Sequence, residues 1–306
     1  MYNWIPYKIT KIDEKERVYW LDIENKRFDE PFFDETISSC KINMANRSKF
    51  LPTSDLGLIK TISQQVESIP INAFIFHVSR CGSTLLSQCL SAVSTNIVVA
   101  EAPILDEILQ NSLHKSEEEI ELLFKETLKI LGQKRNEENL FFVKLDSWHL
   151  NHYEQLRKWF PNTPFYFLIR EPKAIIQSHQ KRRGIHMIPG YLPTTSTNVI
   201  VKQEHFENFD LYTADVLEVF YQKIALILVF KNSLDVVFDY KNSPEKMIYM
   251  FNQLINNQLI DLESMVERTN YHSKFPNQSF SEENPDWTDF PHTSCLQHYL
   301  KLEMYE

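Results

Sequence analysis

The sequence is poor in cysteine: among 306 residues there are four, Cys40, Cys81, Cys89 and Cys295. They show neither a CxxC pair nor a Cys/His spacing of the kind that holds zinc, so we expect no zinc site and free thiols in a reducing compartment. The longest apolar run, Ile224 to Phe230, is far shorter than the roughly 20 residues of a membrane-spanning helix. The first residues contain no apolar stretch of the signal-peptide type. These absences predict a soluble, cytoplasmic protein.

Positive charge is also scarce, because 32 Lys and Arg stand against 41 Asp and Glu, which gives a net charge of −9. This balance argues against a general binder of nucleic acids or anionic membranes. The acidity is uneven, however. Between Arg170 and Arg183 five basic residues stand against one acid, Glu171. A basic island in an acidic protein suggests a small, highly charged anion as the ligand.

From residue 71 onward, short apolar runs alternate with helical patterns. Five runs are typical of buried strands: Phe74–Val78, Ile97–Ala100, Leu140–Leu145, Phe165–Ile169 and Val236–Tyr240. This alternation predicts an α/β fold in three layers, with a central, mostly parallel sheet flanked by helices. Ligands of such a sheet bind at the carboxyl ends of its strands.

Helix boundaries are marked by several capping patterns. Ser116 and Glu119 form a capping box for a helix that Gly132 ends, and Ser243-Pro244 starts another helix. A further helix is expected across Trp148 to Trp159.

The first 70 residues precede the alternating pattern. They include one expected strand at Val18–Ile23, an aromatic turn region at Phe28–Phe33, and a helix from Ser54 to about Val66. We predict that residues 1–70 form an extension packed on the core, and that residues 71–306 form the α/β domain.

The most informative segment is FIFHVSRCGSTLL, residues Phe74–Leu86. A buried strand ends there at a turn of small residues, and a helix follows. Unpaired N–H groups and the helix dipole make such a junction an anion site, unless it is an ordinary strand–turn–helix connection without a ligand. It is not a Walker A loop, because Ser83 stands where the lysine would fall and His77 where the first glycine would fall. The candidate binding residues are Arg80, Cys81, Gly82, Ser83 and Thr84.

Charged residues also follow three other expected strands. Glu101 comes directly after the second strand, Lys144 stands at the end of the third, and Arg170 at the end of the fourth. Ser178 lies eight residues after Arg170, which is about two helical turns. With Arg170 still on the strand, both side chains can reach one phosphate across the turn.

These residues resemble the sulfotransferases that use 3′-phosphoadenosine 5′-phosphosulfate (PAPS). HVSRCGSTLL is similar to their 5′-phosphosulfate loop, in the arginine-bearing version of tyrosylprotein and carbohydrate sulfotransferases and bacterial relatives. FLIREPKAIIQS is similar to their 3′-phosphate motif. The resemblance covers roughly residues 71–255 and implies a P-loop NTPase-like fold. It departs from the cytosolic small-molecule members, which carry a loop lysine and a catalytic histidine, and from the Golgi members, which carry a membrane anchor.

The resemblance implies transfer of a sulfuryl group from PAPS to a hydroxyl or amine, with adenosine 3′,5′-bisphosphate as the product and no metal. Glu101 would be the general base, and Lys144 would contact the transferring group. Arg80 would bind the phosphosulfate, while Arg170 and Ser178 would bind the 3′-phosphate. The acceptor, a small molecule or a peptide, is not legible in the sequence, nor is the oligomeric state. Residues 1–70 are expected on the acceptor side.

Two other functions fit part of the pattern. A P-loop kinase of small molecules would share the strand–loop–helix but needs the missing loop lysine and an Mg²⁺ carboxylate. A nucleotide-binding scaffold would retain the fold without catalysis. His149 and His186 are alternative bases, although lone histidines are more often structural. Residues Gly184–Pro193 are predicted to form a mobile loop over the site. Residues Lys181–Arg183 either solvate a helix end or bind the 3′-phosphate or an acidic acceptor.

Overall fold

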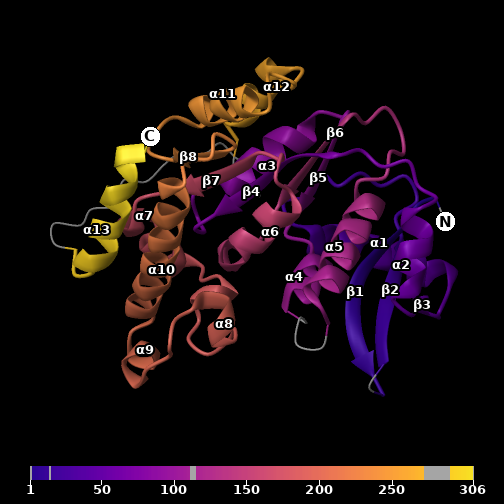
Figure 1. The fold of residues 1–306 in the computed structure, drawn as a ribbon, viewed down its shortest axis with the longest axis horizontal. Coiled ribbons are helices and arrows are strands. Elements are labelled where there is room, and N and C mark those ends of the chain that lie inside the picture. The colour runs from indigo at the N-terminus through magenta and orange to yellow at the C-terminus, as the bar shows by residue number, and fades with distance from the viewer. Residues whose placement is uncertain (1, 14, 111–114, 272–289, 306) are drawn as a thin grey trace. The chain divides into compact units, whose positions relative to one another are not determined.

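The computed structural model describes residues 2–13, 15–110, 115–271 and 290–305, and its elements are labelled in Figure 1. Its larger sheet has five strands in the order β5-β6-β4-β7-β8. Strand β5 pairs parallel with β6, and β7 pairs parallel with β8. The strands are β4 (Ile71–His77), β5 (Asn96–Ala100), β6 (Leu140–Lys144), β7 (Phe165–Ile169) and β8 (Asp235–Asp239). The predicted α/β class and all five predicted strands are confirmed.

Full burial explains why these runs form a covered parallel sheet. Every residue of β5, β6 and β7 is buried, as expected when helices cover both faces and the strands read as continuous apolar runs. The Phe76 ring stacks on Phe167 with centroids 5.0 Å apart.

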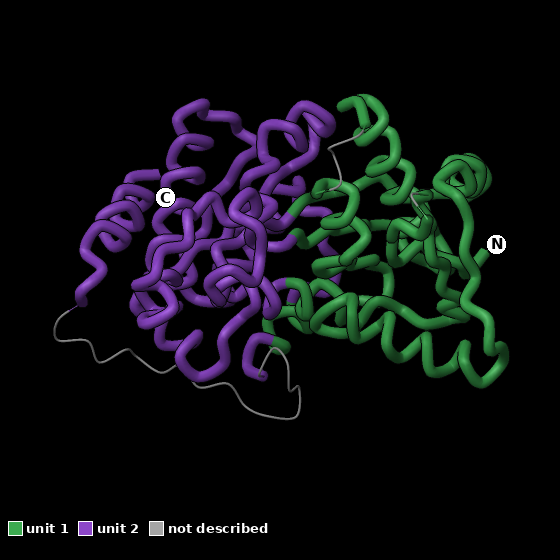
Figure 2. The backbone as a smooth tube through the Cα atoms, turned by 90° about the horizontal axis from the view of Figure 1, so that it is seen from below, with its two compact units in different colours: residues 1–74, 87–145, 263–268 green, residues 75–86, 146–262, 269–306 purple. Residues whose placement is uncertain are grey.

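The chain divides into two compact units, coloured in Figure 2. Unit 1 comprises residues 1–74, 87–145 and 263–268, and unit 2 comprises residues 75–86, 146–262 and 269–306. Three of the boundaries fall inside an element: within β4, within α3 (Ser83–Ala92) and within α12 (Leu262–Arg268). Each unit is described by itself below.

Unit 1 contains a second, antiparallel sheet. Its strands are β1 (Trp4–Ile12), β2 (Lys15–Asp22) and β3 (Thr53–Ser54). Helix α1 contacts β2, helices α4 and α5 contact β1, and α2 contacts α5. Residues 1–70 thus pack on elements that lie between residues 87 and 145, and their place on the acceptor side stays a prediction. The helices are α1 (Phe33–Arg47), α2 (Gly57–Ser63), α4 (Pro103–Gln110) and α5 (Glu117–Leu131).

In unit 1, the helix whose start carries a capping motif in the sequence begins at that motif. The Ser116–Glu119 capping box is present, and Gly132 ends α5 as predicted. The helix predicted from Ser54 is shorter, because Ser54 belongs to β3 and accepts a bond from the Trp20 indole at 2.8 Å. Helix α1 was not predicted. Its N-cap is Phe32, which offers no capping oxygen.

Unit 2 contains β7, β8 and most of the C-terminal helices. Helix α10, the longest at 21 residues, contacts α7 and α13. Ser243 caps α11 by accepting the Lys246 N–H, as predicted. The continuous helix predicted across Trp148–Trp159 is wrong: a 3-10 helix (Ser147–His152) precedes α6 (Tyr153–Trp159). The main helices are α7 (Pro172–Lys181), α10 (Phe209–Val229), α11 (Pro244–Leu254) and α13 (Thr293–Leu302).

Shorter helical segments complete the described chain. They are a 3-10 turn at Ile185–Met187, α8 (Thr194–Thr197), α9 (Gln203–Glu207), α12 (Leu262–Arg268) and a 3-10 turn at Glu303–Tyr305. Within the described ranges, no helix has the length and apolar character needed to cross a bilayer.

Candidate functional site

The predicted phosphate loop connects β4 to α3, and its backbone takes an unusual path. Ser79 and Arg80 have φ values of 80° and 49°, and Gly82 has a φ of 84°. A Cβ on Gly82 would lie 2.3 Å from Cε2 of Tyr240, so the aromatic ring occupies the space that a side chain would need. Glycine is therefore required at this position by both conformation and packing.

Hydrogen bonds fix the loop to the end of β7. The Val78 N–H and the Cys81 thiol both donate to the Leu168 carbonyl, each at 3.2 Å. The Leu86 N–H donates to the Gly82 carbonyl at 3.0 Å, which sets the first turn of α3. N–H groups of a first helical turn lack partners within the helix and attract anions. Unit 2 thus holds a strand–loop–helix junction whose loop is fixed by hydrogen bonds.

Arg170 is joined to this loop. Its Nη1 donates to the Arg80 carbonyl at 3.1 Å, and its guanidinium lies 5.1 Å from the centre of the Tyr240 ring. The Tyr221 hydroxyl donates to the Arg170 carbonyl at 2.7 Å, and burial raises the pKa of Tyr221 well above its usual value, so it stays a donor. The structure thus brings two predicted site residues, Arg80 and Arg170, together. Ser178 lies half-buried on α7, and its carbonyl accepts the Arg182 N–H.

The rest of the basic island has different partners. Arg80 Nη2 donates to the Arg182 carbonyl at 2.5 Å. Arg183 bonds Asp210 at 2.6 Å and the Thr213 hydroxyl at 2.6 Å, so it fixes the start of α10. Residues Lys181–Arg183 were predicted either to solvate a helix end or to bind an anion. Arg183 has its partners within the fold, Asp210 and Thr213.

In unit 1 the two predicted residues Glu101 and Lys144 form an ion pair. Lys144 Nζ lies 2.6 Å from Glu101 Oε1, and the Lys144 side chain is fully buried. The Glu101 N–H donates to the Lys144 carbonyl at 2.8 Å, and the Phe32 ring lies 5.2 Å from Lys144 Nζ. A buried lysine of this kind needs its carboxylate, because an uncompensated buried charge is costly.

Positive φ values occur both in the β4–α3 loop of unit 2 and at Glu101 in unit 1. Ten described non-glycine residues have positive φ, and five of them are Asp or Asn, which tolerate it best. The other five are Glu24, Ser79, Arg80, Glu101 and Lys231. Two of these are predicted site residues and a third, Ser79, adjoins one. Strain of this kind clusters at functional positions.

Two carboxylates of unit 1 escaped prediction. Desolvation and the nearby Glu101 raise the pKa of Asp34, which stands in the first turn of α1, and Lys41 opposes this shift. Burial raises the pKa of Glu107, on α4, to about 7, although the Ile9 N–H bond lowers it. Asp34 lies 67 positions from Glu101 and directly after the segment interpreted as a turn, so no sequence spacing connects the two.

The two histidines considered as alternative bases, His149 and His186, lie in unit 2 and are held by contacts within the fold. His149 is buried, and its Nδ1 accepts the Asp146 N–H at 3.2 Å. His186 packs against Trp148 and against His179 at ring distances of 5.7 and 5.8 Å. His179, which was not singled out in the sequence, lies 3.1 Å from the Ser79 hydroxyl.

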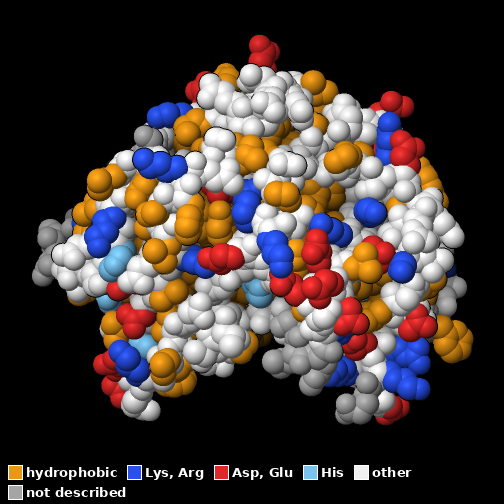
Figure 3. All heavy atoms as spheres, in the orientation of Figure 1, with side chains coloured by type: hydrophobic (Ala, Val, Ile, Leu, Met, Phe, Trp, Pro, Cys, Tyr) orange, Lys and Arg blue, Asp and Glu red, His pale blue; other side chains and the backbone are white. Residues whose placement is uncertain are grey.

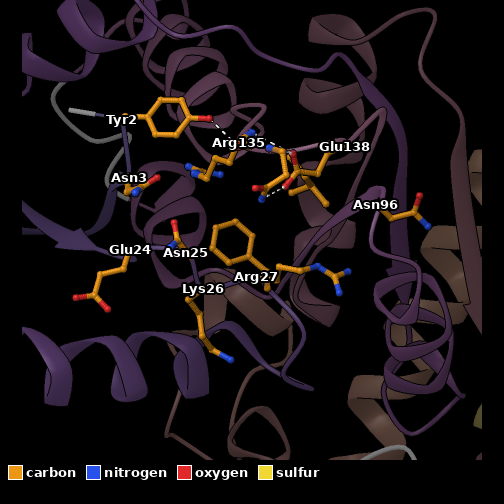
Figure 4. A pocket seen from close by; sticks show the side chains of 12 residues that line it. Tyr2, Asn3, Glu24, Asn25, Lys26, Arg27, Asn96, Arg135 and Glu138 are labelled. Carbon is orange, nitrogen blue, oxygen red and sulfur yellow. Dashed lines mark hydrogen bonds between the residues drawn. The ribbon is translucent and has the colours of Figure 1, made fainter.

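A separate pocket in unit 1, with an open volume of about 430 Å³, is shown in Figure 4. Arg135 donates to the carbonyls of Gln133 and Ile130 at the end of α5, and burial lowers its pKa to about 10. Arg27 donates to the Ser91 and Val93 carbonyls at the end of α3. These cations complete helix ends, and none of the predicted site residues lines the pocket.

Charge on the face drawn in Figure 3 is mixed. Lys and Arg side chains are interspersed there with Asp and Glu side chains, and hydrophobic side chains lie between them. A protein whose basic residues serve a small anion needs no broad positive surface.

No known family model and no curated protein matches the sequence. Among solved structures, the chain is similar to sulfotransferase STF9 from Mycobacterium avium, with 10% identity, a TM-score of 0.53 and coverage of 82% of this chain and 81% of that one. The sulfotransferase domain of the Synechococcus PCC 7002 olefin synthase matches at 12% identity and a TM-score of 0.47, over 78% of this chain and 96% of that one. The similarity to STF9 shows that the chain has the fold of the sulfotransferases.

Proposed function

We propose that the protein is a sulfotransferase that moves a sulfuryl group from PAPS to a hydroxyl or amine and leaves adenosine 3′,5′-bisphosphate. The observation that carries this proposal is the assembly in unit 2 of a positive-φ phosphate loop, the Arg170 guanidinium on that loop and the Tyr240 ring against Gly82. The fold shared with solved sulfotransferases supports it.

Unit 2 would bind the donor. The first-turn N–H groups of α3, with Cys81, Gly82 and the hydroxyls of Ser83 and Thr84, would hold the 5′-phosphosulfate. Arg170 and Ser178 would hold the 3′-phosphate. During transfer the bond from sulfur to the bridging oxygen breaks, and the bisphosphate leaves with the electron pair. Arg80 would stabilise the negative charge that develops on that oxygen.

Unit 1 would serve the acceptor. As the new bond from sulfur to the acceptor's oxygen or nitrogen forms, the acceptor's proton passes to the Glu101 carboxylate. Lys144, already bonded to Glu101, would share its charge with the transferring group. Substituting either residue should therefore lower turnover more than donor affinity.

A binding experiment tests the donor assignment without an acceptor. Adenosine 3′,5′-bisphosphate at 100 times its Kd should stabilise the fold by about 2.7 kcal/mol, and AMP should stabilise it less. A thermal shift with ATP and Mg²⁺ but none with the bisphosphate would favour a kinase and refute the proposal.

The acceptor can then be sought by intact-mass analysis of pooled hydroxyl and amine compounds after incubation with PAPS. A gain of one sulfuryl group identifies the product. Because we expect no metal in the mechanism, the reaction should proceed in EDTA at its full rate.

A further inference from the structure

His179 links the phosphate loop to the segment that follows α7. Its Nε2 lies 3.1 Å from the Ser79 hydroxyl, and its Nδ1 accepts the Gly184 N–H at 3.2 Å. The ring is almost fully buried at 1% exposure. One side chain therefore bonds a residue of the loop and a residue 105 positions further along the chain.

These two bonds fix the tautomer of the ring. Because Nδ1 accepts a hydrogen bond from Gly184, the neutral ring carries its proton on Nε2 and donates it to Ser79 Oγ. The Ser79 hydroxyl is thus an acceptor toward His179 and keeps its own proton for another bond. Protonation of the ring at Nδ1 would remove the Gly184 bond.

Ser79 has a conformation that requires such support. Its φ of 80° lies in the left-handed region, which a serine adopts only where its surroundings fix it. Its N–H donates to His77 Nδ1 at 3.1 Å, and its side chain meets His179. Ser79 is buried at 5% exposure, so both bonds are shielded from water.

A second bond runs in parallel with the first. Arg80 Nη2 donates to the Arg182 carbonyl at 2.5 Å. Gly184 also packs closely, since a Cβ there would lie 3.0 Å from the His186 ring and 3.4 Å from the His179 ring. Two adjacent loop residues are therefore bonded to the same short segment, residues 179–184.

We propose that His179 is a positioning residue that holds the Ser79 turn in its anion-binding conformation and joins it to Gly184. The relation to PAPS rests on the proposed function; the link itself does not. Binding of an anion in the loop would then also restrain Gly184, the first residue of the Gly184–Pro193 loop, because the His179 ring is bonded to Ser79 through Nε2 and to Gly184 through Nδ1.

Two amide variants separate the two bonds. Asparagine places a polar atom near the position of Nδ1, and glutamine places one near the position of Nε2. H179N therefore retains the Gly184 bond and loses the Ser79 bond, whereas H179Q does the reverse. S79A removes the Ser79 bond without altering the buried ring, and it provides a measurement if either histidine variant folds poorly.

The first measurement is hydrogen–deuterium exchange of the Gly184 amide in the unliganded protein. Loss of one hydrogen bond should raise its exchange rate by about tenfold in H179Q and leave it nearly unchanged in H179N and S79A. Equal exchange in all the variants and the wild type would overturn the link.

The second measurement is the affinity for adenosine 3′,5′-bisphosphate by calorimetry. Affinity should fall by about tenfold in H179N and in S79A, and stay within about threefold in H179Q. The S79A/H179N double variant should bind no more weakly than either single one, because both remove the same bond. Additive losses, or equal affinities in H179N and H179Q, would overturn the positioning role. If the wild type fails to bind the bisphosphate, the donor assignment falls and the exchange rates alone decide the link.

Discussion

The charged residues predicted for the site are held in different ways in the two units. In unit 1 a buried lysine meets a carboxylate, Lys144 with Glu101 at 2.6 Å, so opposite charges neutralise each other inside the protein. In unit 2 two arginines donate to backbone carbonyls, Arg170 to Arg80 and Arg80 to Arg182. A carbonyl oxygen orients a guanidinium without cancelling its charge. The first arrangement fixes a carboxylate beside one cation, whereas the second leaves positive charge available to an anion.

The difference also appears in how each arrangement would fail. Removing one partner of the buried pair leaves a full charge unpaired in unit 1. Removing Arg170 or Arg80 in unit 2 leaves a backbone carbonyl without that donor, which costs the fold less than it costs the binding of an anionic ligand. Substitutions should therefore separate stability from binding in unit 2, and combine stability with turnover in unit 1.

The largest effect is expected for Glu101→Gln. If Glu101 takes the acceptor's proton, turnover should fall by about 100-fold or more, while bisphosphate affinity stays within a few fold. Because Lys144 is fully buried, the variant should also lose about 3–5 kcal/mol of unfolding free energy.

A double variant separates the two consequences. E101Q/K144M removes both charges of the pair and should recover most of the stability without recovering turnover. Steady-state kinetics and urea unfolding of both variants measure this. Near-normal turnover in E101Q would exclude Glu101 as the base and direct the search to His149.

Arg170→Ala should have the next largest effect. Loss of a charge-assisted bond to the 3′-phosphate should weaken bisphosphate binding by about 10- to 100-fold, with little change for AMP. Arg183→Ala is the matched control, because Arg183 bonds Asp210; it should lower stability and leave the affinity unchanged. Calorimetry with both ligands measures the outcome. Equal losses for AMP and the bisphosphate would show that Arg170 acts on the fold alone.

The sequence predicted the parts of this comparison that are local. The five strands could be predicted because each follows a mainly apolar run, and three of them, β5, β6 and β7, are buried along their whole length. The strand–loop–helix junction could be predicted because its strand, turn and helix follow one another in thirteen residues. Helix α5 could be bounded because its capping box and its glycine are both present.

The features that were not predicted depend on contacts between residues far apart in the sequence. Ser79 and His179 are 100 positions apart. Tyr240, which directly follows β8, fills the space beside Gly82. Helix α1 was not predicted because Phe32 provides no capping oxygen. Asp34, in the first turn of that helix, was therefore not identified as a candidate residue. Long-range packing, rather than local preference, completes both arrangements.

Gly82→Ala tests whether the loop of unit 2 is fixed by packing as well as by backbone conformation. The new Cβ would meet the Tyr240 ring at 2.3 Å, so we expect a loss of about 2–3 kcal/mol of unfolding free energy together with weaker bisphosphate binding. Gly190→Ala is the matched control. Gly190 has a similar φ of 74°, but its Cβ would lie 3.7 Å from Phe206, so it should lose only about 1 kcal/mol. Equal losses in thermal and urea unfolding would mean that the Tyr240 contact contributes nothing.

The smallest effect concerns Glu107, whose burial in unit 1 raises its pKa to about 7 from an ordinary value of 4.5. The native state then keeps a proton that the unfolded chain releases near pH 4.5, so the native state binds more protons between these two values. Stability from this group is fully present below pH 4.5 and is lost as the pH rises to about 7. Glu107→Gln, which resembles the protonated form, should flatten that slope and gain about 1 kcal/mol at pH 8. Urea unfolding at pH 5 and pH 8 measures this, with the exposed Glu35→Gln of the same unit as the control. An unchanged slope in E107Q would show that solvent reaches Glu107.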